Sequence, residues 1–125
     1  MDLLITQPAI TTELIHSHRI LPMLTLANRD HMSEFGSVFI TQSNNSKINK
    51  LEDIEGKSIA AVAPLALGGW LAGYNELFDN NIDPIKDNKV TFLGGNQKNV
   101  INSILENKYD VGVIRTGMLE KLSKK

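Results

Sequence analysis

The chain has 125 residues, a formal net charge of -1, no cysteine and 42% hydrophobic residues. This length and apolar content fit one ordinary domain or one lobe of a larger protein. The balanced charge gives no whole-molecule basis for binding nucleic acid, so we expect no nucleic-acid partner. Without cysteine, disulfide scaffolds and thiolate metal sites are excluded. No apolar run reaches the roughly 18–20 residues that cross a bilayer.

The first residues predict a strand followed by a helix. Residues 2–6 form an apolar run typical of a buried strand. Thr6 and Gln7 then precede a proline suited to the first helical turn, and apolar spacing predicts a short helix over residues 8–17.

A second group of elements follows up to residue 46. Residues 19–27 are another extended apolar stretch, in which Pro22 favours a sheet edge or a bulge. Residues 28–34 predict a polar loop, residues 36–42 a strand, and residues 43–46 a surface connection.

Helical spacing of apolar residues continues before the next strand. Ile48, Leu51 and Ile54 predict one or two helical turns, ended by Gly56 because glycine readily takes positive φ. Residues 58–62 predict the strand that follows.

The stretch 57–70 changes from a strand to a loop and then to a helix start. Pro64 breaks the strand, Gly68 and Gly69 follow, and Trp70 begins an apolar face with helical periodicity. Open α/β sheets hold ligands at such junctions, because the unpaired amides of a helix start favour anions. We therefore predict a ligand site here.

The remaining chain alternates strands and helices. Residues 89–94 and 109–114 predict strands, an amphipathic helix lies between them, and residues 116–125 predict a last helix. Residues 94–98 contain two glycines without phosphate-loop spacing and predict a turn. The alternation predicts a parallel α/β sheet, and we expect two small α/β clusters, joined near residues 36–41, with a cleft between them.

Arg115 is the strongest candidate for the charge that selects a ligand. It follows the last strand directly, at the edge where the glycine loop also lies, although an ordinary surface ion pair is the alternative. Thr116 is either a ligand hydroxyl or a helix cap. Thr6 and Gln7 hold the equivalent strand-end position in the first half, with the same alternative of a helix cap.

Three residues of the junction have two interpretations each. Gly68 and Gly69 serve either turn geometry and packing or close backbone approach to a ligand. Trp70 continues the apolar face and is either core or cleft surface. A helix start contributes about 0.3–1 kcal/mol toward an exposed anion, whereas a charged hydrogen bond adds roughly 1.5–3 kcal/mol. We therefore expect a cation to carry more of the affinity than the amides.

Catalytic and cofactor motifs are missing from the sequence. It has no Gly-x-Ser-x-Gly, no Walker loop, no Gly-x-Gly-x-x-Gly and no cysteine nucleophile. His16 and His18 would point apart on a helix, and no carboxylate cluster stands near them. We expect no metal, no cofactor and no catalytic activity of this segment.

Several motifs resemble one family of binding proteins. Residues 51–60, reading LEDIEGKSIA, resemble the turn and strand that open the second lobe of type 2 periplasmic solute-binding proteins. Residues 68–70, 81–84, 90–94 and 110–120 are similar, in order and spacing, to the phosphonate-binding-protein-like branch. Within that branch the likeness is greatest to extracytoplasmic sensor domains of two-component histidine kinases, including the tetrathionate-sensor kind. The resemblance reaches back to residues 2–8, at the strand and turn of the first lobe that faces the cleft.

The resemblance implies a three-layer α/β/α fold with one complete lobe and part of another. Residues 1–40 would be a truncated first lobe, 41–115 the second lobe, and 116–125 the start of the return segment. The chain would be the extracytoplasmic, periplasmic part of an inner-membrane sensor kinase and bind a small anionic solute between its lobes. Its partners would be that solute and the rest of the same polypeptide, with a homodimer as a further option.

One departure from the family pattern bears on the ligand. Phosphonate binders of this branch place hydroxyls in the loop that begins the second-lobe helix, whereas residues 63–69 contain none. Phosphonate is therefore disfavoured, and another small anion or a carboxylate is expected. Two alternatives stay open: the solute-binding component of an ABC transporter for a small oxyanion, and, in another class, a small α/β enzyme or a ligand-free interaction module.

Overall fold

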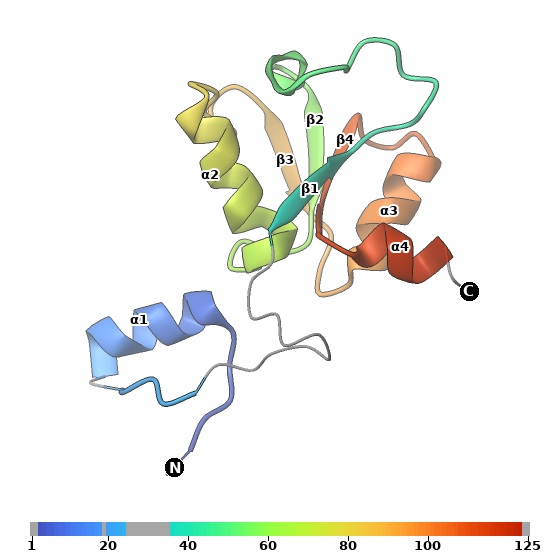
Figure 1. Ribbon diagram of the computed structural model, residues 1–125. Helices are drawn as coiled ribbons and strands as arrows, with labels where there is room; N and C mark the ends of the chain where they lie inside the picture. Colours follow the sequence, from blue (N-terminus) through green and yellow to red (C-terminus); the bar gives the residue numbers. More distant parts are fainter. Residues whose placement is uncertain (1–2, 19, 25–35, 124–125) are drawn as a thin grey trace. The chain divides into compact units, whose positions relative to one another are not determined.

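A computed structural model describes residues 3–18, 20–24 and 36–123 of the chain. The chain divides into two compact units, Met1–Phe35 and Gly36–Lys125, and each is described by itself. Figure 1 shows the helix of the first unit and the sheet and helices of the second. The predicted division into a first lobe, a second lobe and a return segment stays a prediction.

The first unit contains helix α1, Pro8–His18, which confirms the predicted helix. Pro8 occupies its first position, where its missing N–H costs nothing. The backbone carbonyl of Gln7 accepts a hydrogen bond of 3.0 Å from the amide of Thr11.

The strand predicted at residues 2–6 is wrong for the part that the structure describes. Residues 3–7 have no regular secondary structure, and Leu3 and Ile5 are 73% and 75% exposed. A strand needs a neighbour for its N–H and C=O groups, and none is described in this unit. Residues 20–24 likewise have no regular structure. Residues 19 and 25–27 of that apolar stretch, and the polar loop at 28–34, lie outside the described residues.

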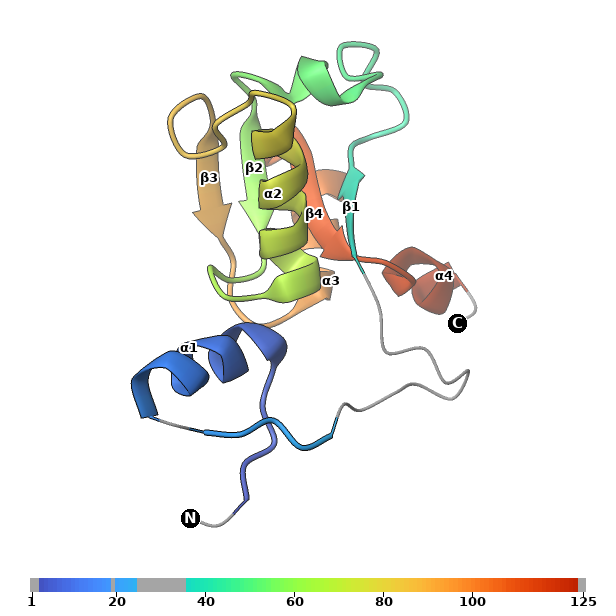
Figure 2. The same cartoon turned by 60° about the vertical axis from the view of Figure 1, so that its left-hand side comes forward.

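The second unit is built on a four-stranded sheet with the order β1-β4-β2-β3. Its strands are β1 (Ser37–Ile40), β2 (Ser58–Ala61), β3 (Lys89–Phe92) and β4 (Val111–Arg115). Strand β2 runs parallel to both β3 and β4, as the alternation of elements predicts. Strand β1 runs antiparallel to β4 at one edge of the sheet, as Figure 2 shows. This pairing was not predicted, because the spacing of apolar residues carries no strand direction.

Helices cover both faces of this sheet. Its helical segments are η1 (Leu51–Ile54), η2 (Leu67–Leu71), α2 (Ala72–Asp79), α3 (Gln97–Leu105) and α4 (Met118–Ser123). Helix α2 lies on one face and α3 on the other, which confirms the three-layer arrangement (Figure 1). Gly56 ends the η1 turn with φ +75°, as predicted. No helix in the described part of the chain is long and apolar enough to cross a membrane.

Two apolar cores result from the alternation of strand side chains. Ile59 and Ala61 of β2 face α2, whereas Ala60 and the following Val62 face α3. All four side chains are nearly inaccessible to solvent. The central strands are therefore fixed in register by burial on both faces.

Candidate functional site

The carboxyl ends of the three parallel strands lie at one edge of the sheet. We call the loops that follow β2, β3 and β4, residues 62–66, 93–96 and 116–117, the carboxyl edge. The helical segments η2, α3 and α4 begin directly after these loops. First-turn amides have no partner within their own helix and favour negative charge. The predicted ligand site would lie at this edge, and it stays a prediction.

The loop after β2 is held by backbone hydrogen bonds. The amide of Val62 donates to the carbonyl of Gly69 at 3.2 Å, and the amide of Ala66 donates to the carbonyl of Ala63 at 3.1 Å. Pro64 is exposed in the turn that this second bond closes. The loop is a short, tied connection that brings the strand end close to the first turn of the helix.

The glycines of this junction lie inside the first helical turn, because the helix begins at Leu67 and not after Gly69 as predicted. This turn is a π-helix, in which Gly68, Gly69 and Trp70 are buried. A Cβ on Gly69 would lie 2.7 Å from Cγ2 and 2.9 Å from Cβ of Val62. Packing therefore accounts for the glycine at position 69. A direct ligand contact by either glycine stays a prediction.

Trp70 belongs to the core between α2 and the sheet. It is 4% exposed, and its ring centroid lies 5.4 Å from that of Phe92 and 5.7 Å from that of Tyr74. The core interpretation of Trp70 accounts for these contacts, and a ligand contact by its ring stays a prediction.

Arg115 lies one residue further into the sheet than predicted, as the last residue of β4. It is exposed and stands opposite Ser37 in the antiparallel pair. Its backbone amide donates to Oε1 of Gln97 at 2.9 Å, and its Nη2 lies 3.9 Å from Sδ of Met118. Gln97 of α3 thus holds the backbone of Arg115, and Met118 of α4 contacts its guanidinium.

Thr116 extends the pairing of β1 and β4 by one residue. Its amide donates to the carbonyl of Gly36 at 3.0 Å, and its Oγ1 accepts from the amide of Gly36 at 3.2 Å. The hydroxyl therefore serves the sheet at the point where the second unit begins. A contact of Thr116 with ligand stays a prediction. Thr6 and Gln7 lie in the first unit, so their part in a common site also stays a prediction.

Two residues that adjoin the carboxyl edge were not predicted from the sequence. Gln97 opens α3 and binds the backbone of Arg115 through its side chain. Ser37 opens β1, and its hydroxyl contacts the helix start beyond β2. A glutamine in a turn and a serine at a strand start carry no recognisable signal, because their partners lie 18 or more positions away.

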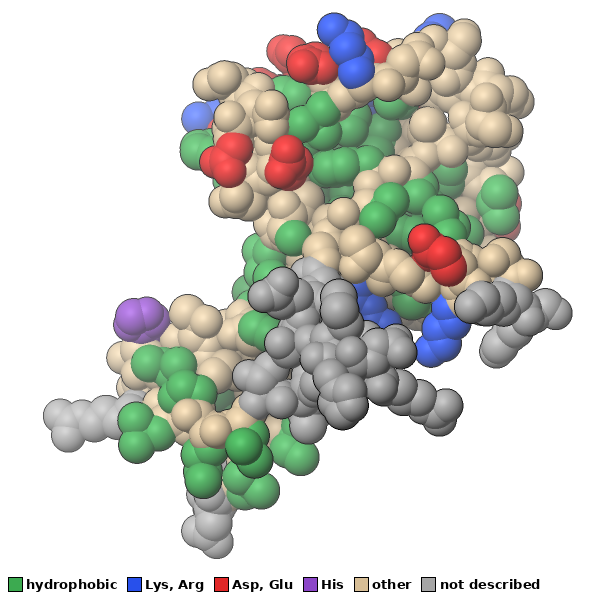
Figure 3. Space-filling view, viewed as in Figure 1, with side chains coloured by type: hydrophobic (Ala, Val, Ile, Leu, Met, Phe, Trp, Pro, Cys, Tyr) green, Lys and Arg blue, Asp and Glu red, His purple; other side chains and the backbone are tan. Residues whose placement is uncertain are grey.

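Two hollows of the second unit lie at the opposite, amino edge of the sheet. One, of about 490 Å³, lies over η1, and Figure 3 shows acidic and basic side chains gathered on that side. Another, of about 230 Å³, is lined mainly by amide side chains between the start of β4 and the loop after β1. The first is lined by Lys47, Glu52, Asp53, Glu55, Gly56, Lys57 and Asp87. Neither of these two hollows lies at the carboxyl edge.

Carboxylates at the amino edge are engaged in local structure. Asp53 accepts from the amides of Asn49 at 2.9 Å and Lys50 at 3.2 Å, and the bond from Asn49 is the main cause of its lowered pKa. Asp110 accepts from the hydroxyl of Ser58 at 2.6 Å and from its amide at 3.0 Å, and these bonds lower its pKa. These carboxylates fasten turns and strand starts.

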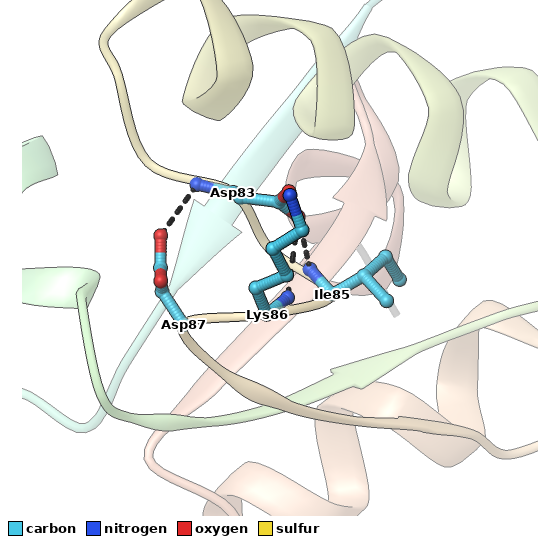
Figure 4. A network of polar contacts seen from close by, with 4 residues as sticks. All are labelled: Asp83, Ile85, Lys86 and Asp87. Carbon is cyan, nitrogen blue, oxygen red and sulfur yellow. Dashed lines mark hydrogen bonds and ion pairs between the residues drawn. The ribbon is translucent and has the colours of Figure 1, made fainter.

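A further carboxylate network closes the loop between α2 and β3 (Figure 4). Asp83 accepts from the amides of Ile85 at 3.0 Å and Lys86 at 3.2 Å, while its own amide donates to Asp87 at 2.8 Å. Desolvation raises the pKa of Asp83, but the amides of Lys86 and Ile85 and the ammonium of Lys86 together lower it below its usual value. Within residues 3–18, 20–24 and 36–123, no group of three or more His, Cys, Asp or Glu residues is placed to hold a metal.

The whole chain matches one known protein family. Residues 1–125 match the model of a family described as "ABC transporter, phosphonate, periplasmic substrate-binding protein". The chain belongs to this family. The family consists of periplasmic binding proteins rather than enzymes, which agrees with the mixed α/β architecture and with the predicted class of binding domain.

Two individual proteins resemble the chain, one in sequence and one in fold. The chain is 28% identical, over 127 aligned residues, to the tetrathionate sensor histidine kinase TtrS of Salmonella typhimurium. That match covers 98% of this chain and 21% of the kinase, so the chain spans about a fifth of its relative's length. Among solved structures, XAC2383 from Xanthomonas citri bound to ATP is similar with a TM-score of 0.54 and 21% identity. It covers 66% of this chain and 33% of that one, and shows the likeness of fold alone.

Proposed function

We propose that the chain is the extracytoplasmic ligand-binding domain of a two-component sensor histidine kinase and binds a small anionic solute between two lobes. The match to a tetrathionate sensor kinase over 98% of the chain carries this proposal. The family description supplies the binding function. The kinase part and the membrane anchor belong to the rest of the polypeptide.

The carboxyl edge supports an anion as the ligand. Helix α3 points its amino end at this edge, and Arg115 lies beside it on β4. A guanidinium offers several N–H donors in a planar fork that matches oxyanion geometry. Since a charged hydrogen bond contributes about 1.5–3 kcal/mol and an exposed helix start about 0.3–1 kcal/mol, Arg115 dominates the proposed affinity. Thr116, Pro64 and the junction glycines complete the proposed contact surface.

The chemistry of the β2 loop narrows the ligand class. Residues 63–69 supply backbone amides but no hydroxyl, so the cradle suits an anion with dispersed charge better than a phosphonate. A thio-anion such as tetrathionate, which the kinase relative is named for, and small carboxylates are the proposed class.

Exposed apolar residues in the first unit support a partner within the same polypeptide. Three of them are largely exposed: Leu21 at 84%, Met23 at 79% and Leu24 at 93%. Leu3 and Ile5 are exposed as well. Burying an apolar side chain of this size is favourable by about 1.5–3 kcal/mol. We propose that further segments of the longer protein cover them and complete the lobe to which Thr6 and Gln7 belong. Pairing of two copies stays a prediction.

The proposed signal depends on a difference between the ligand's affinities for two arrangements of the protein. A ligand that contacts both lobes binds the closed arrangement more tightly than the open one, and only that difference shifts the equilibrium. The proposed output is a change in the attached kinase.

A transport solute-binding protein is the second candidate, because the family description names an ABC transporter. Such a protein would release its ligand to a permease and would carry no kinase. The sequence that adjoins this segment in the gene separates the two candidates.

The function is tested on the full-length protein in lipid nanodiscs. Sodium tetrathionate, sodium methylphosphonate and sodium succinate are added separately, and autophosphorylation and binding heat are measured. We expect tetrathionate or succinate to bind and to change autophosphorylation, with methylphosphonate weaker. Binding by a full-length protein that has no autophosphorylation activity would favour the transport candidate. Binding that leaves autophosphorylation unchanged, or no binding of any of the three, would contradict the proposal.

A further inference from the structure

The hydroxyl of Ser37 is inserted between backbone groups where η2 continues into α2. In a π-helix the carbonyl of residue i accepts from the amide of residue i+5. The amide of Leu71 donates to Ala66 at 3.0 Å, and the amide of Ala72 donates to Leu67, so two such bonds are present. The next pair is Gly68 and Gly73.

Ser37 stands between the members of that next pair. Its Oγ donates to the carbonyl of Gly68 at 2.9 Å and accepts from the amide of Gly73 at 2.9 Å. The hydroxyl therefore bridges the two backbone groups that the next bond of the π type would join. Side chains that insert into a helix ladder are a recognised cause of local opening.

Close packing of α2 against the sheet brings the hydroxyl within reach. A Cβ on Gly73 would lie 3.0 Å from Cγ1 of Val113, 3.2 Å from Cζ of Phe39 and 3.3 Å from Cβ of Ser37. Only glycine at position 73 leaves room for these three side chains. The close contact between Gly73 and Ser37 therefore joins two distant parts of the chain.

The same serine is linked to the candidate cation. Ser37 is the first residue of β1, and its Cα pairs with that of Arg115 at the end of β4. Its side chain thus connects the η2 turn, which contains Gly68 and Gly69, with the strand pair that holds Arg115. Turns of this π type occur frequently at functional sites.

We propose that Ser37 is a positioning residue of the ligand site: its hydroxyl holds the η2 turn in the π form and so sets the geometry of this turn relative to Arg115. The inference rests on the proposed function. Without the hydroxyl, Gly68 and Gly73 either bond directly or lose their partners, and both outcomes move the turn.

The experiment compares Ser37→Ala with Ser37→Thr and Ser58→Ala in the full-length protein. The threonine variant keeps a hydroxyl at this position. Ser58 is a matched control because it also opens a strand and also makes paired hydrogen bonds, but to Asp110 at the amino edge. Hydrogen–deuterium exchange of peptides spanning residues 66–74 and the affinity for sodium tetrathionate and sodium succinate are measured.

For Ser37→Ala we expect exchange over residues 66–74 to be about fivefold faster and anion affinity to fall about three- to tenfold, while Ser37→Thr retains both properties. Ser58→Ala should lower stability without changing either readout. Unchanged exchange in Ser37→Ala, changed exchange with unchanged affinity, or equal effects in Ser58→Ala would each overturn the inference. Absence of binding by the unmodified protein would instead overturn the proposed function, and the exchange result would still decide whether the hydroxyl holds the turn.

Discussion

The two edges of the sheet differ in what their polar groups do. At the amino edge, Asp53 and Asp110 bind backbone amides or a hydroxyl of their own unit, and their lowered pKa values reflect that engagement. At the carboxyl edge, helix starts and Arg115 lie around short loops without acidic residues. Hollows and dense charge occur at the first edge, whereas the arrangement suited to an anion occurs at the second.

The proposed ligand site follows strand direction and not the two hollows at the amino edge. Parallel strands followed by helices place helix amino ends together at one edge, whatever the side chains are. At the amino edge, by contrast, Asp53 and Asp110 accept hydrogen bonds from a turn and from a strand start of their own unit.

Gly69→Ala should have the largest effect on stability. The added Cβ would meet Val62 at 2.7 Å, so the junction must shift, and overpacking of this kind costs about 1–3 kcal/mol. The measurement is urea unfolding of the full-length protein, with Gly95→Ala as control. A Cβ on Gly95 meets nothing within 4 Å, so we expect little change there. Equal stability of the two variants would show that the carboxyl edge is not closely packed.

Asp110→Asn tests the fastening at the amino edge. We expect a loss of about 1 kcal/mol at pH 7, which is below the roughly 1.5–3 kcal/mol of charged hydrogen bonds because Asp110 is exposed. The folded-state pKa lies below the ordinary 3.8, so this stability is present above pH 3.8 and is lost as the pH falls through the folded-state value. The gap between wild type and variant should therefore close at low pH.

The check is urea unfolding as a function of pH, beside Glu55→Gln. Glu55 is an exposed carboxylate at the same edge. A pH-independent gap for Asp110→Asn, or the same gap for Glu55→Gln, would contradict the role assigned to Asp110.

Gln42→Ala should have an effect of about the same size at the amino edge. Nε2 of Gln42 donates to the carbonyls of Ile104 at 2.7 Å and Leu105 at 2.9 Å, in the last turn of α3. We expect a loss of about 0.5–1.5 kcal/mol, with faster amide exchange at the end of α3. Asn44→Ala, an exposed neighbour, serves as the control and should be near neutral. If both variants behave alike, Gln42 does not cap the helix.

The elements of the second unit were largely predictable from apolar periodicity. Helix α3 and the central strands β2 and β4 bury regularly spaced residues, and that regularity is visible in the sequence. The run at residues 2–6 has the same apolar character but lacks a described strand partner, and an unpaired strand is not stable. Apolar composition therefore indicates which residues need burial, but not which part of the protein covers them.

The candidate site was predictable only in part. Arg115 and the glycine junction follow from their place after strands, which the sequence shows. The contacts of Ser37 and Gln97 depend on residues brought together by folding, and the π turn depends on a hydroxyl 31 positions from its acceptor. The antiparallel direction of β1 likewise follows from three-dimensional pairing, not from local pattern.

The most direct test of the account is an anion titration of the full-length protein carrying Arg115→Ala or Lys47→Ala. Each variant removes one positive charge, the first at the carboxyl edge and the second in the hollow at the amino edge. We predict that Arg115→Ala weakens binding of sodium tetrathionate or sodium succinate by about tenfold or more, and that Lys47→Ala leaves it unchanged. Unchanged affinity in Arg115→Ala, or an equal loss in Lys47→Ala, would contradict the assignment of the ligand site to the carboxyl edge.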